Sequence, residues 1–318
     1  MNRRENFETC RVSVIIPSFY RYEYLKDVLD KLCRQTHHVH EVVVPDQTPL
    51  HHIPGGFYEA FYERLPLKVL HVEQPNISAP RNQAAKTATG DILLFLDDDV
   101  LIKENLVAAH LAVMEEENVD VVNGAVCLQE TLPDAYPWDV RQMDPVRFFL
   151  AAPNHHWQGM MLGVSSCNFS IKREVFLKVG GFDEKLPRMV DFEMGYRLFR
   201  AGAKIYFSDK PFAQHLRAPG GSRQNPRNHN KLVAALYIHR KHFPGWITTQ
   251  FMLKMSIGPL FNRWSFRTPF RVVVGIYRVF RAAAKVDKLL RPVEKGIPFM
   301  VHSAQKKSNG DLVVNQVA

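Results

Sequence analysis

The sequence predicts an α/β protein with a Rossmann-like, mostly parallel sheet flanked by helices. Between residues 11 and 100, short runs of valine, isoleucine and leucine alternate with helix-like segments, which is typical of βαβ units. These runs are continuous and do not alternate with polar residues, so we expect strands that are buried on both faces. The chain has 318 residues, 46% of them hydrophobic, which is ample for a core.

The expected elements follow one another in a regular order. Strands are expected at RVSVIIP (11–17), HEVVVPD (40–46), LKVLHVEQ (67–74) and DILLFLDDD (91–99), and helices at YLKDVLDKLCRQ (24–35) and ISAPRNQAAKTATG (77–90). In open sheets of this kind, ligands bind at the carboxyl ends of the strands. Residues 17–21, 45–48 and 97–99 are therefore expected to border one crevice.

The second half of the chain contains a further strand, a long connection and two more helices. The expected segments are a strand at 119–128, a proline- and aromatic-rich stretch at 129–162, LGVSSCNFSI (162–171), a helix REVFLKVGG (173–181), a helix around 191–202 and final strands at 204–209 and 211–216. Gly202 suits the end of the second helix. We expect a catalytic domain at residues 1–245 and a basic, amphipathic helical region at 246–318.

One segment of this C-terminal region predicts an amphipathic helix. Thr268 and Pro269 suit a helix start, and Pro292 supplies a stop. The apolar residues Val272, Ile276, Val279, Ala283, Val286 and Leu290 share one face, and Arg267, Arg271, Arg278, Arg281, Lys285 and Lys288 cluster on the opposite one. Three interpretations stay open: residues 268–291 lie on an anionic membrane surface, pack on the protein's own surface, or pair as a heptad-type dimer.

The distribution of charge limits the classes of partner. The net charge is +9, but residues 240–318 hold 14 Lys/Arg against 3 Asp/Glu, so the excess belongs to the tail and we expect no nucleic-acid partner. No secretory signal and no apolar run long enough to span a bilayer are evident. The four cysteines lack the spacing of a disulfide framework or zinc site. We expect a cytoplasmic protein, peripheral at the inner face of the cell membrane if the tail binds lipid.

Three consecutive aspartates, Asp97, Asp98 and Asp99, end the strand DILLFL. Their charges repel one another, and a divalent cation would hold them ionised; aspartate oxygens suit Mg²⁺ or Mn²⁺. In a strand, Asp97 and Asp99 point to one side and Asp98 to the other. The alternative interpretation is a solvated acidic turn before the next helix.

Five blocks in order resemble family-2 glycosyltransferases with the GT-A fold. They are VSVIIPSFYR, EVVVPDQT, NISAPRNQAAKTATGDILLFLDDD, CNFSIKREVFLKVGGFDEKL and VDFEMGYRLFRAG, and together they cover roughly residues 11 to 217. The resemblance implies a metal-dependent, inverting enzyme of the hexosyltransferase type.

The resemblance also assigns roles at matching positions. It implies nucleotide-sugar binding by Pro17, Ser18, Phe19, Arg21, Asp46, Arg81, Asn82, Asp97 and Asp98, with Asp46 on the base and Asp98 turned away to support the turn. It implies Mn²⁺ or Mg²⁺ binding by Asp99, Asp97 and His215. Asp191 matches the general base, with Glu193 in reserve, and these two residues cannot share one face of a helix. Tyr20, Pro45 and Val190 depart from the family's pattern.

The function implied is sugar transfer from a nucleotide-diphosphate-sugar donor to a glycan or lipid-linked acceptor, in cell-surface polysaccharide biosynthesis. Two alternatives remain open. A sugar-1-phosphate nucleotidyltransferase also uses an α/β fold and acidic metal ligands, although it usually has an early glycine-rich loop, and PSFYRYEY contains no glycine. A catalytically inactive glycan- or nucleotide-binding module is the other.

Overall fold

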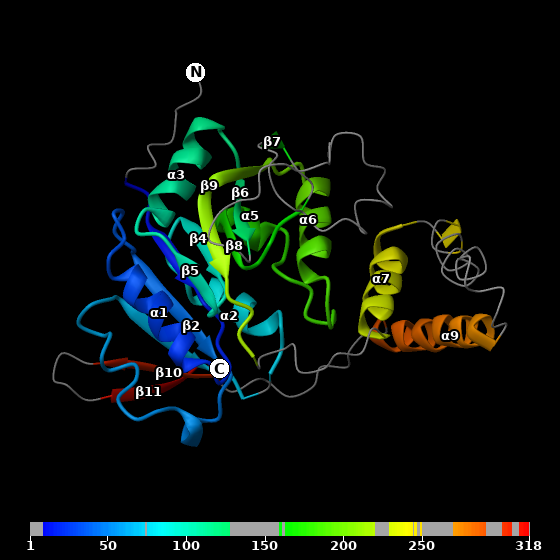
Figure 1. The fold of residues 1–318 in the computed structure, drawn as a ribbon, viewed down its shortest axis with the longest axis horizontal. Helices are drawn as coiled ribbons and strands as arrows, with labels where there is room; N and C mark the ends of the chain where they lie inside the picture. The colour runs from blue at the N-terminus through cyan, green and yellow to red at the C-terminus, as the bar shows by residue number, and fades with distance from the viewer. Residues whose placement is uncertain are drawn as a thin grey trace.

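The computed structural model contains one mixed sheet with helices packed against it (Figure 1). It describes residues 9–73, 75–127, 159–160, 163–219, 229–243, 245, 246, 249, 270–290, 301–306 and 312–317. Most of the long connection expected at 129–162 lies outside the described residues, as does most of 251–269.

The strands lie in the order β11-β10-β3-β2-β1-β4-β8-β6-β9-β5, and β7 also pairs with β9. Their bounds are β1 Val12–Ile15, β2 Glu41–Asp46, β3 Leu67–His71, β4 Ile92–Leu96, β5 Val100–Ile102, β6 Val121–Cys127, β7 Gly159–Met160, β8 Asn168–Lys172, β9 Ile205–His215, β10 Val301–Lys306 and β11 Leu312–Val317. The neighbours β3, β2, β1 and β4 are all parallel. All residues of β1, β2 and β4 are buried, as their continuous apolar runs predicted.

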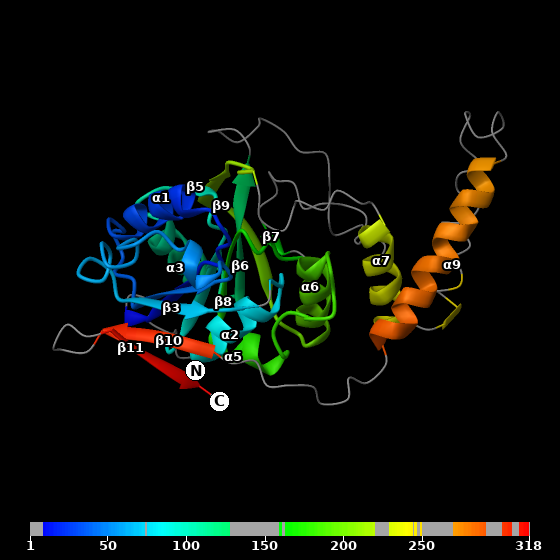
Figure 2. The same ribbon diagram turned by 90° about the horizontal axis from the view of Figure 1, so that it is seen from below.

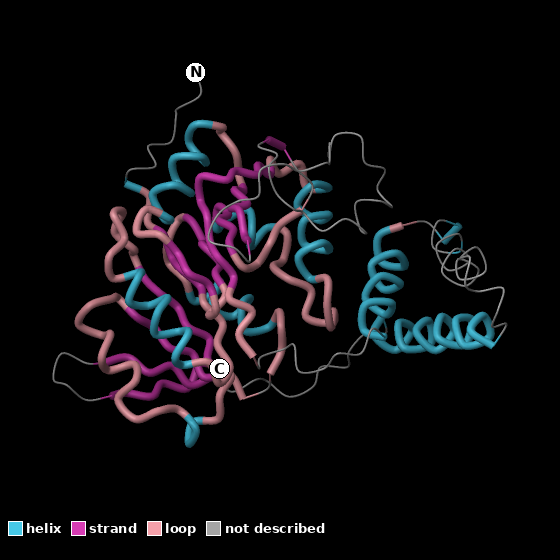
Figure 3. Tube along the Cα trace, in the orientation of Figure 1, coloured by secondary structure: helices cyan, strands magenta, loops and turns pink. Residues whose placement is uncertain are grey.

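Helices α1 Tyr22–Leu32 and α3 Leu106–Glu116 cover one face of the sheet, and α2 Ala79–Thr87, α5 Arg173–Lys178 and α6 Val190–Arg200 cover the other (Figure 3). Helices α7 His229–His242 and α9 Phe270–Leu290 lie beyond α6, to the side of the sheet (Figure 1). A short 3₁₀ turn, η2, is at Leu50–His52. Successive strand residues point to opposite faces. Leu94 therefore packs in the core with α1 and α3, and Phe95 in the core with α2, α5 and α6.

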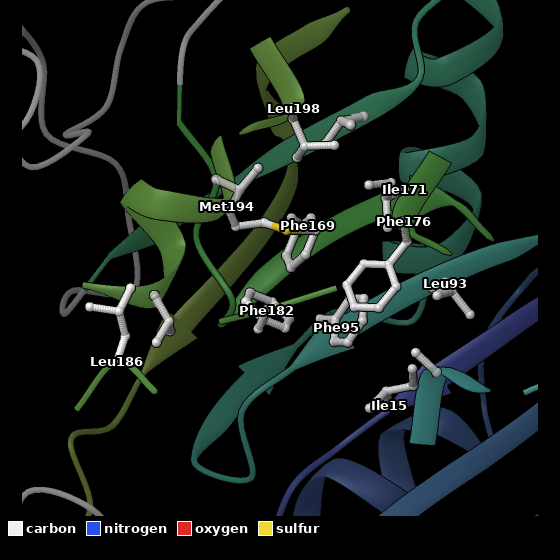
Figure 4. Packing of buried hydrophobic residues seen from close by; sticks show 14 of the residues in the cluster. Ile15, Leu93, Phe95, Phe169, Ile171, Phe176, Phe182, Leu186, Met194 and Leu198 are labelled. Carbon is white, nitrogen blue, oxygen red and sulfur yellow. The ribbon is translucent and has the colours of Figure 1, made fainter. Parts of the chain in front are cut away.

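Four aromatic rings form the centre of the core that contains Phe95 and lies with α2, α5 and α6 (Figure 4). Phe95 stacks on Phe169 with ring centroids 4.8 Å apart, and Phe176 and Phe182 pack around the pair. Removing one such ring would cost roughly 3–5 kcal/mol. These rings fix β4 against β8, and both strands border the site described below.

The prediction of a mostly parallel sheet holds for β3, β2, β1 and β4 and for the pair of β6 and β9, and the remaining pairs make the sheet mixed. β8 lies antiparallel between β4 and β6, and β5 and β7 pair antiparallel with β9. An apolar run predicts a strand but carries no information on its direction. The two final strands expected at 204–209 and 211–216 are one continuous strand, β9, whose register with β6 shifts between Gly124 and Ala125.

The C-terminal region is helical in α9 and extended at its end (Figure 2). Residues Val301–Lys306 and Leu312–Val317 were expected to be helical, but they form β10 and β11, and β10 pairs antiparallel with β3. Helix α9 packs on α7, and Val279, Ala283 and Val286 of its apolar stripe are buried. The interpretation of packing on the protein's own surface thus holds for these described side chains. Among the described helices, none has the length and apolar character that a bilayer crossing requires.

Candidate active site

A hollow of about 830 Å³ lies where β1 and β4 end, in front of the first turn of α6. Its volume is within the usual range for small-molecule sites. The structure brings eight predicted residues to its wall: Pro17, Ser18, Phe19, Arg21, Arg81, Asp97, Asp98 and Asp191. The rest of the lining comes from residues for which the sequence predicted no role. They are Gln47, Pro75, Asn76, Ile77, Ser166, Cys167, Arg188, Met189 and Val190.

The turn after β1 is held by backbone bonds to the turn after β2. Ser18 N–H donates to Pro45 O at 3.2 Å, and Gln47 N–H donates to Ser18 O at 3.0 Å. Tyr20, where the family has asparagine, adopts φ 59°, and its N–H donates to Thr48 Oγ1 at 2.9 Å. Its ring is half exposed, and its hydroxyl lies 2.7 Å from His52 Nδ1. This turn places Phe19 and Arg21 on the wall of the hollow.

Each carboxylate of the acidic triplet already has a basic partner. Arg81 Nη2 donates to Asp97 Oδ1 at 2.8 Å. Arg21 Nη1 lies 2.9 Å from Asp98 Oδ1 and 3.1 Å from Asp99 Oδ2. The expectation that a cation must relieve the repulsion is therefore corrected, because two arginines do so in this structure.

Asp98 and Asp99 differ from their expected orientations. Asp98 was expected to face away, but it lines the hollow and accepts a hydrogen bond from Ser18 Oγ at 3.0 Å. Asp99 is 1% exposed, and its Oδ2 accepts from Ala218 N–H at 2.9 Å. Its Oδ1 has no hydrogen-bond partner among the described residues. Strand alternation does not extend to these residues, because β4 ends at Leu96 and Arg21 Nη1 contacts both Asp98 and Asp99. Asp97 and Asp98 line the hollow, and Asp99 does not.

His215, at the end of β9, lies between Asp97 and Asp99. Its Nε2 is 3.7 Å from Asp97 Oδ2, and its Nδ1 is 3.7 Å from Asp99 Oδ2. Arg217 N–H donates to Nδ1 at 3.0 Å. Asp97, His215 and Cys167 each offer a ligand atom within 4.8 Å of the others. This donor set is able to hold a divalent cation.

Cys167 was missed because its position depends on the direction of β8. Leu96 of β4 lies opposite Asn168 of β8 in an antiparallel ladder. Continuing that ladder by one residue sets Asp97 opposite Cys167. In a parallel sheet, Cys167 would have lain at the far edge, away from the hollow. A prediction that β8 runs antiparallel to β4 would have placed Cys167 at the hollow.

Asp46 does not reach the hollow. It is fully buried, and its carboxylate accepts from Tyr22 Oη and Tyr58 Oη, each at 2.7 Å, and from Thr48 N–H at 2.9 Å. These bonds tie the end of β2 to α1 and to the segment around Tyr58. The neighbouring Gln47 lines the hollow in its place, and its Oε1 accepts from Asn76 N–H at 2.8 Å.

Asn82 also lies away from the hollow. Its Nδ2 donates to Phe182 O and Glu184 Oε1, both at 2.8 Å, and its Oδ1 accepts from Phe182 N–H at 2.8 Å. Gly181 has φ +68°, and a Cβ there would lie 2.5 Å from Asn82 Oδ1. Asn82 therefore fastens α2 to the turn before α6, while Arg81, one residue earlier, faces the hollow.

Asp191 lies in the first turn of α6 and shares the hollow with Asp97. One oxygen, Oδ1, is buried without a hydrogen-bond partner among the described residues. Glu193 is fully buried on another side of α6, where Arg197, Lys241 and His242 contact its carboxylate at 2.7–2.8 Å. The prediction that these two acids occupy different faces is confirmed, and Glu193 does not line the hollow.

The surroundings move the pKa values of these acids in different directions. Burial opposes ionisation of Asp97, but His215 and Arg81 hold its pKa well below its usual range. Burial raises the pKa of Asp98 to about 6, even beside Arg21. Burial also raises the pKa of Asp191, and the charge of Asp97 adds to this rise. Burial, with the charges of Asp97 and Asp191, raises the pKa of the Cys167 thiol. The hollow thus contains one strongly ionised carboxylate, Asp97, and two with increased affinity for a proton, Asp98 and Asp191.

Two curated relatives and one solved structure resemble the chain. An O-antigen biosynthesis protein, RfbC of Myxococcus xanthus, is 27% identical over 62% of this chain and 16% of its own. Chondroitin synthase of Pasteurella multocida is 26% identical over 73% of this chain and 28% of its own. The chain thus spans much less than two thirds of either relative. The crystal structure of GalNAc-T7 with UDP, GalNAc and Mn²⁺ superposes with a TM-score of 0.59 at 16% identity, covering 87% of this chain and 55% of that one, which shows the fold.

The sequence profile of glycosyl transferase family 2 matches residues 13–180. That span is more than half of the chain and includes β1, β2, β4, the acidic triplet and Cys167. The chain belongs to glycosyl transferase family 2.

Proposed function

We propose that this protein is an inverting glycosyltransferase that moves a sugar from a nucleotide-diphosphate-sugar donor to a hydroxyl of a glycan or lipid-linked acceptor. The observation that carries the proposal is Asp191: its side chain is part-buried, its pKa is raised, and its buried Oδ1 has no hydrogen-bond partner among the described residues, in the same hollow as the ionised Asp97. A role in cell-surface polysaccharide biosynthesis is supported by the similarity to a protein named for O-antigen biosynthesis.

The donor side of the proposed site is the wall formed by β1 and β4. Phe19 and Gln47 border the part where a nucleotide base would lie, and Arg81 and Arg188 supply positive charge for a diphosphate. Asp97 and His215, with Asp99 beside the ring, would hold a Mn²⁺ or Mg²⁺ ion. Such an ion, when bound, would offset the negative charge that develops on the leaving diphosphate.

Asp191 is the proposed general base. It would accept the proton of the acceptor hydroxyl while that oxygen attacks the anomeric carbon and the bond to the diphosphate breaks. A raised pKa makes the ionised carboxylate a better proton acceptor near neutral pH. A single displacement of this kind inverts the anomeric centre. The departing diphosphate needs no acid, so one base is sufficient.

Product analysis tests this proposal against both alternatives. Full-length protein is incubated with nucleotide sugars, Mn²⁺ and glycan or lipid-linked acceptors, and released nucleoside diphosphate is measured. Transfer to an acceptor with inversion supports the proposal. Formation of pyrophosphate from a nucleoside triphosphate and a sugar 1-phosphate would show a nucleotidyltransferase instead. Binding of nucleotide sugars without turnover across the acceptor panel would indicate an inactive module.

We also propose that α9 contacts an anionic membrane surface, through a different face from the apolar stripe. Val279, Ala283 and Val286 of that stripe are buried, whereas Tyr277 and Phe280 are 62% and 66% exposed. Arg281, Lys285 and Lys288 are exposed beside them. Aromatic and basic side chains on one helix face suit the interface of an anionic bilayer. Such contact would place the enzyme at the inner face of the cell membrane.

Vesicle sedimentation tests this face. The Tyr277→Ser/Phe280→Ser protein should bind anionic vesicles roughly tenfold more weakly than wild type, and binding should weaken with added salt. Leu50→Ser is the matched control, because Leu50 is 61% exposed on η2, in a different element. Equal binding by the double variant and wild type would exclude this contact.

A further inference from the structure

Cys167 faces the candidate cation site through the ladder between β4 and β8. The antiparallel pairing sets it opposite Asp97, and its Sγ lies within 4.8 Å of ligand atoms from both Asp97 and His215. A thiol in this place is chemically distinct from the oxygens that Mg²⁺ prefers. Cys167 also lines the hollow, so the sulfur is next to the space that a donor would fill.

The two residues beside Cys167 have ligand atoms that lie close to each other. Asp97 uses Oδ1 for Arg81, while Oδ2 lies 3.7 Å from His215 Nε2. Nitrogen and oxygen ligands of a tetrahedral zinc ion are about 3.4 Å apart, so a small closure of this pair would suffice. The ionised sulfur and carboxylate together would supply two negative charges, which match a divalent ion.

Asp99 lies behind the histidine ring as a supporting carboxylate. Its Oδ2 is 3.7 Å from Nδ1, the ring nitrogen on the other side from Asp97. In this structure Nδ1 accepts from Arg217 N–H at 3.0 Å, so the neutral ring has its proton on Nε2. Cation binding at Nε2 requires the other tautomer, whose Nδ1–H would exchange Arg217 for Asp99 as its partner; metal-binding histidines commonly donate their second N–H to a carboxylate in this way. Asp99 also retains Oδ1 without a hydrogen-bond partner among the described residues. Its burial and its bond to Ala218 N–H suit this supporting position better than direct contact with a cation.

We propose that Cys167 binds the cation through sulfur, together with Asp97 and His215, and that the site therefore prefers a borderline ion such as Zn²⁺ or Co²⁺ to Mg²⁺. This deepens the proposed function by naming the ion class of the donor site. Coordination replaces the S–H bond with a sulfur–metal bond, and the proton passes to water. The remaining coordination positions stay open to the hollow.

Cobalt spectroscopy of the full-length protein tests this assignment without any sugar donor. Co²⁺ is added anaerobically to metal-free protein, and the near-ultraviolet sulfur-to-cobalt charge-transfer band is recorded. Wild type should show the band, and excess Mg²⁺ should fail to remove it. Cys167→Ser should lose the band and bind Co²⁺ roughly tenfold or more weakly. Cys33→Ser is the matched control, since Cys33 is a part-buried cysteine at the end of α1, and it should retain the band.

Three outcomes would overturn the assignment: Co²⁺ binding by wild type without the band, no Co²⁺ binding, or a band that persists in Cys167→Ser. The first two are measured on the unaltered protein, so a folding defect in the variant does not affect them. The test is also independent of the proposed reaction. Sugar transfer without the band would refute only the sulfur ligand, and the band without transfer would refute only the proposed reaction.

Discussion

Two carboxylates line the same hollow and are held in opposite ways. Asp97, after β4, contacts Arg81 and His215, and they hold its pKa below its usual range. Asp191, at the start of α6, has hydrogen bonds from Ser166 that favour its ionised form, yet burial still raises its pKa. Asp97 therefore stays ionised, whereas Asp191 retains affinity for a proton. Asp98 lies between these cases, because burial raises its pKa even beside Arg21.

This difference indicates a division of labour between the two walls. The β4 wall is a region of balanced charge, suited to a cation and a diphosphate. The α6 wall provides a group that can exchange a proton. Chemically identical side chains thus acquire different capacities from their neighbours, as in other enzymes that use paired carboxylates. The predictions below test each side of this contrast.

The largest effect is expected from Asp191→Asn. The amide keeps the shape but cannot accept the acceptor's proton, so sugar transfer should fall by about 10²–10⁴-fold, with nucleotide affinity unchanged. Rates and nucleotide binding are measured on the same preparation. Glu193→Gln, two residues along α6, is the control. It disturbs the contacts with Arg197, Lys241 and His242, so it should lower the melting temperature and retain most transfer activity. Near-normal sugar transfer by Asp191→Asn would show that Asp191 is not the general base, and the contrast between the β4 and α6 walls would then fail.

Arg21→Met should destabilise the β4 wall. The methionine leaves Asp98 and Asp99 as buried carboxylates without their arginine, and breaking a buried pair of this kind costs about 3–5 kcal/mol. Urea unfolding of the two proteins measures the difference. Arg11→Met removes an arginine that contacts Asp91 with both side chains about half exposed, and its unfolding should match wild type. A similar loss of unfolding free energy in both variants would mean that burial of the triplet carboxylates does not add to the cost of removing their arginine.

The sequence predicted the acidic triplet from a local pattern, since Asp97–Asp99 follow an unbroken apolar strand. Asp191 was predicted from the resemblance to family-2 glycosyltransferases, and the structure places it on the wall of the same hollow. Cys167 was beyond such reasoning, because its place depends on β8 running antiparallel to β4. Strand direction is decided by tertiary packing, which a local apolar run does not encode.

Asp46 and Asn82 show a second limit of sequence reasoning. Both match family positions, and both are adjacent to a residue that lines the hollow, Gln47 and Arg81. Motif spacing predicts which turn borders a site, but the side chain that points inward depends on what its neighbour can bind. Asp46 is held by Tyr22 and Tyr58, and their hydroxyls come from segments that a motif does not include.

The smallest expected effect is a pH dependence that separates Asp98 from its neighbour Asp97. The pKa of Asp98 is about 6 in the folded protein, above its unfolded value of about 3.9. Its contribution to stability is therefore fully present below about pH 4 and is lost as pH rises through about 6. The pKa of Asp97 is lowered, so its contribution is present above the unfolded pKa and is lost as pH falls.

The free energies of unfolding of wild type and Asp98→Asn are measured at about pH 7.5 and about pH 4.5. The difference between the two proteins isolates the contribution of the Asp98 carboxyl to stability. Wild type should gain about 2 kcal/mol relative to the variant on acidification, because only the carboxyl takes up a proton. Asp97→Asn should show almost no change relative to wild type over this range, because about pH 4.5 is still above the unfolded pKa of about 3.9. The change in Asp191 cancels between wild type and Asp98→Asn, whereas Asp97→Asn also removes a charge that helps to raise the pKa of Asp191. If the Asp97→Asn comparison shifted as much as the Asp98→Asn comparison, the two neighbours would share one environment, and the balance of charge on the β4 wall would rest on the triplet as a whole.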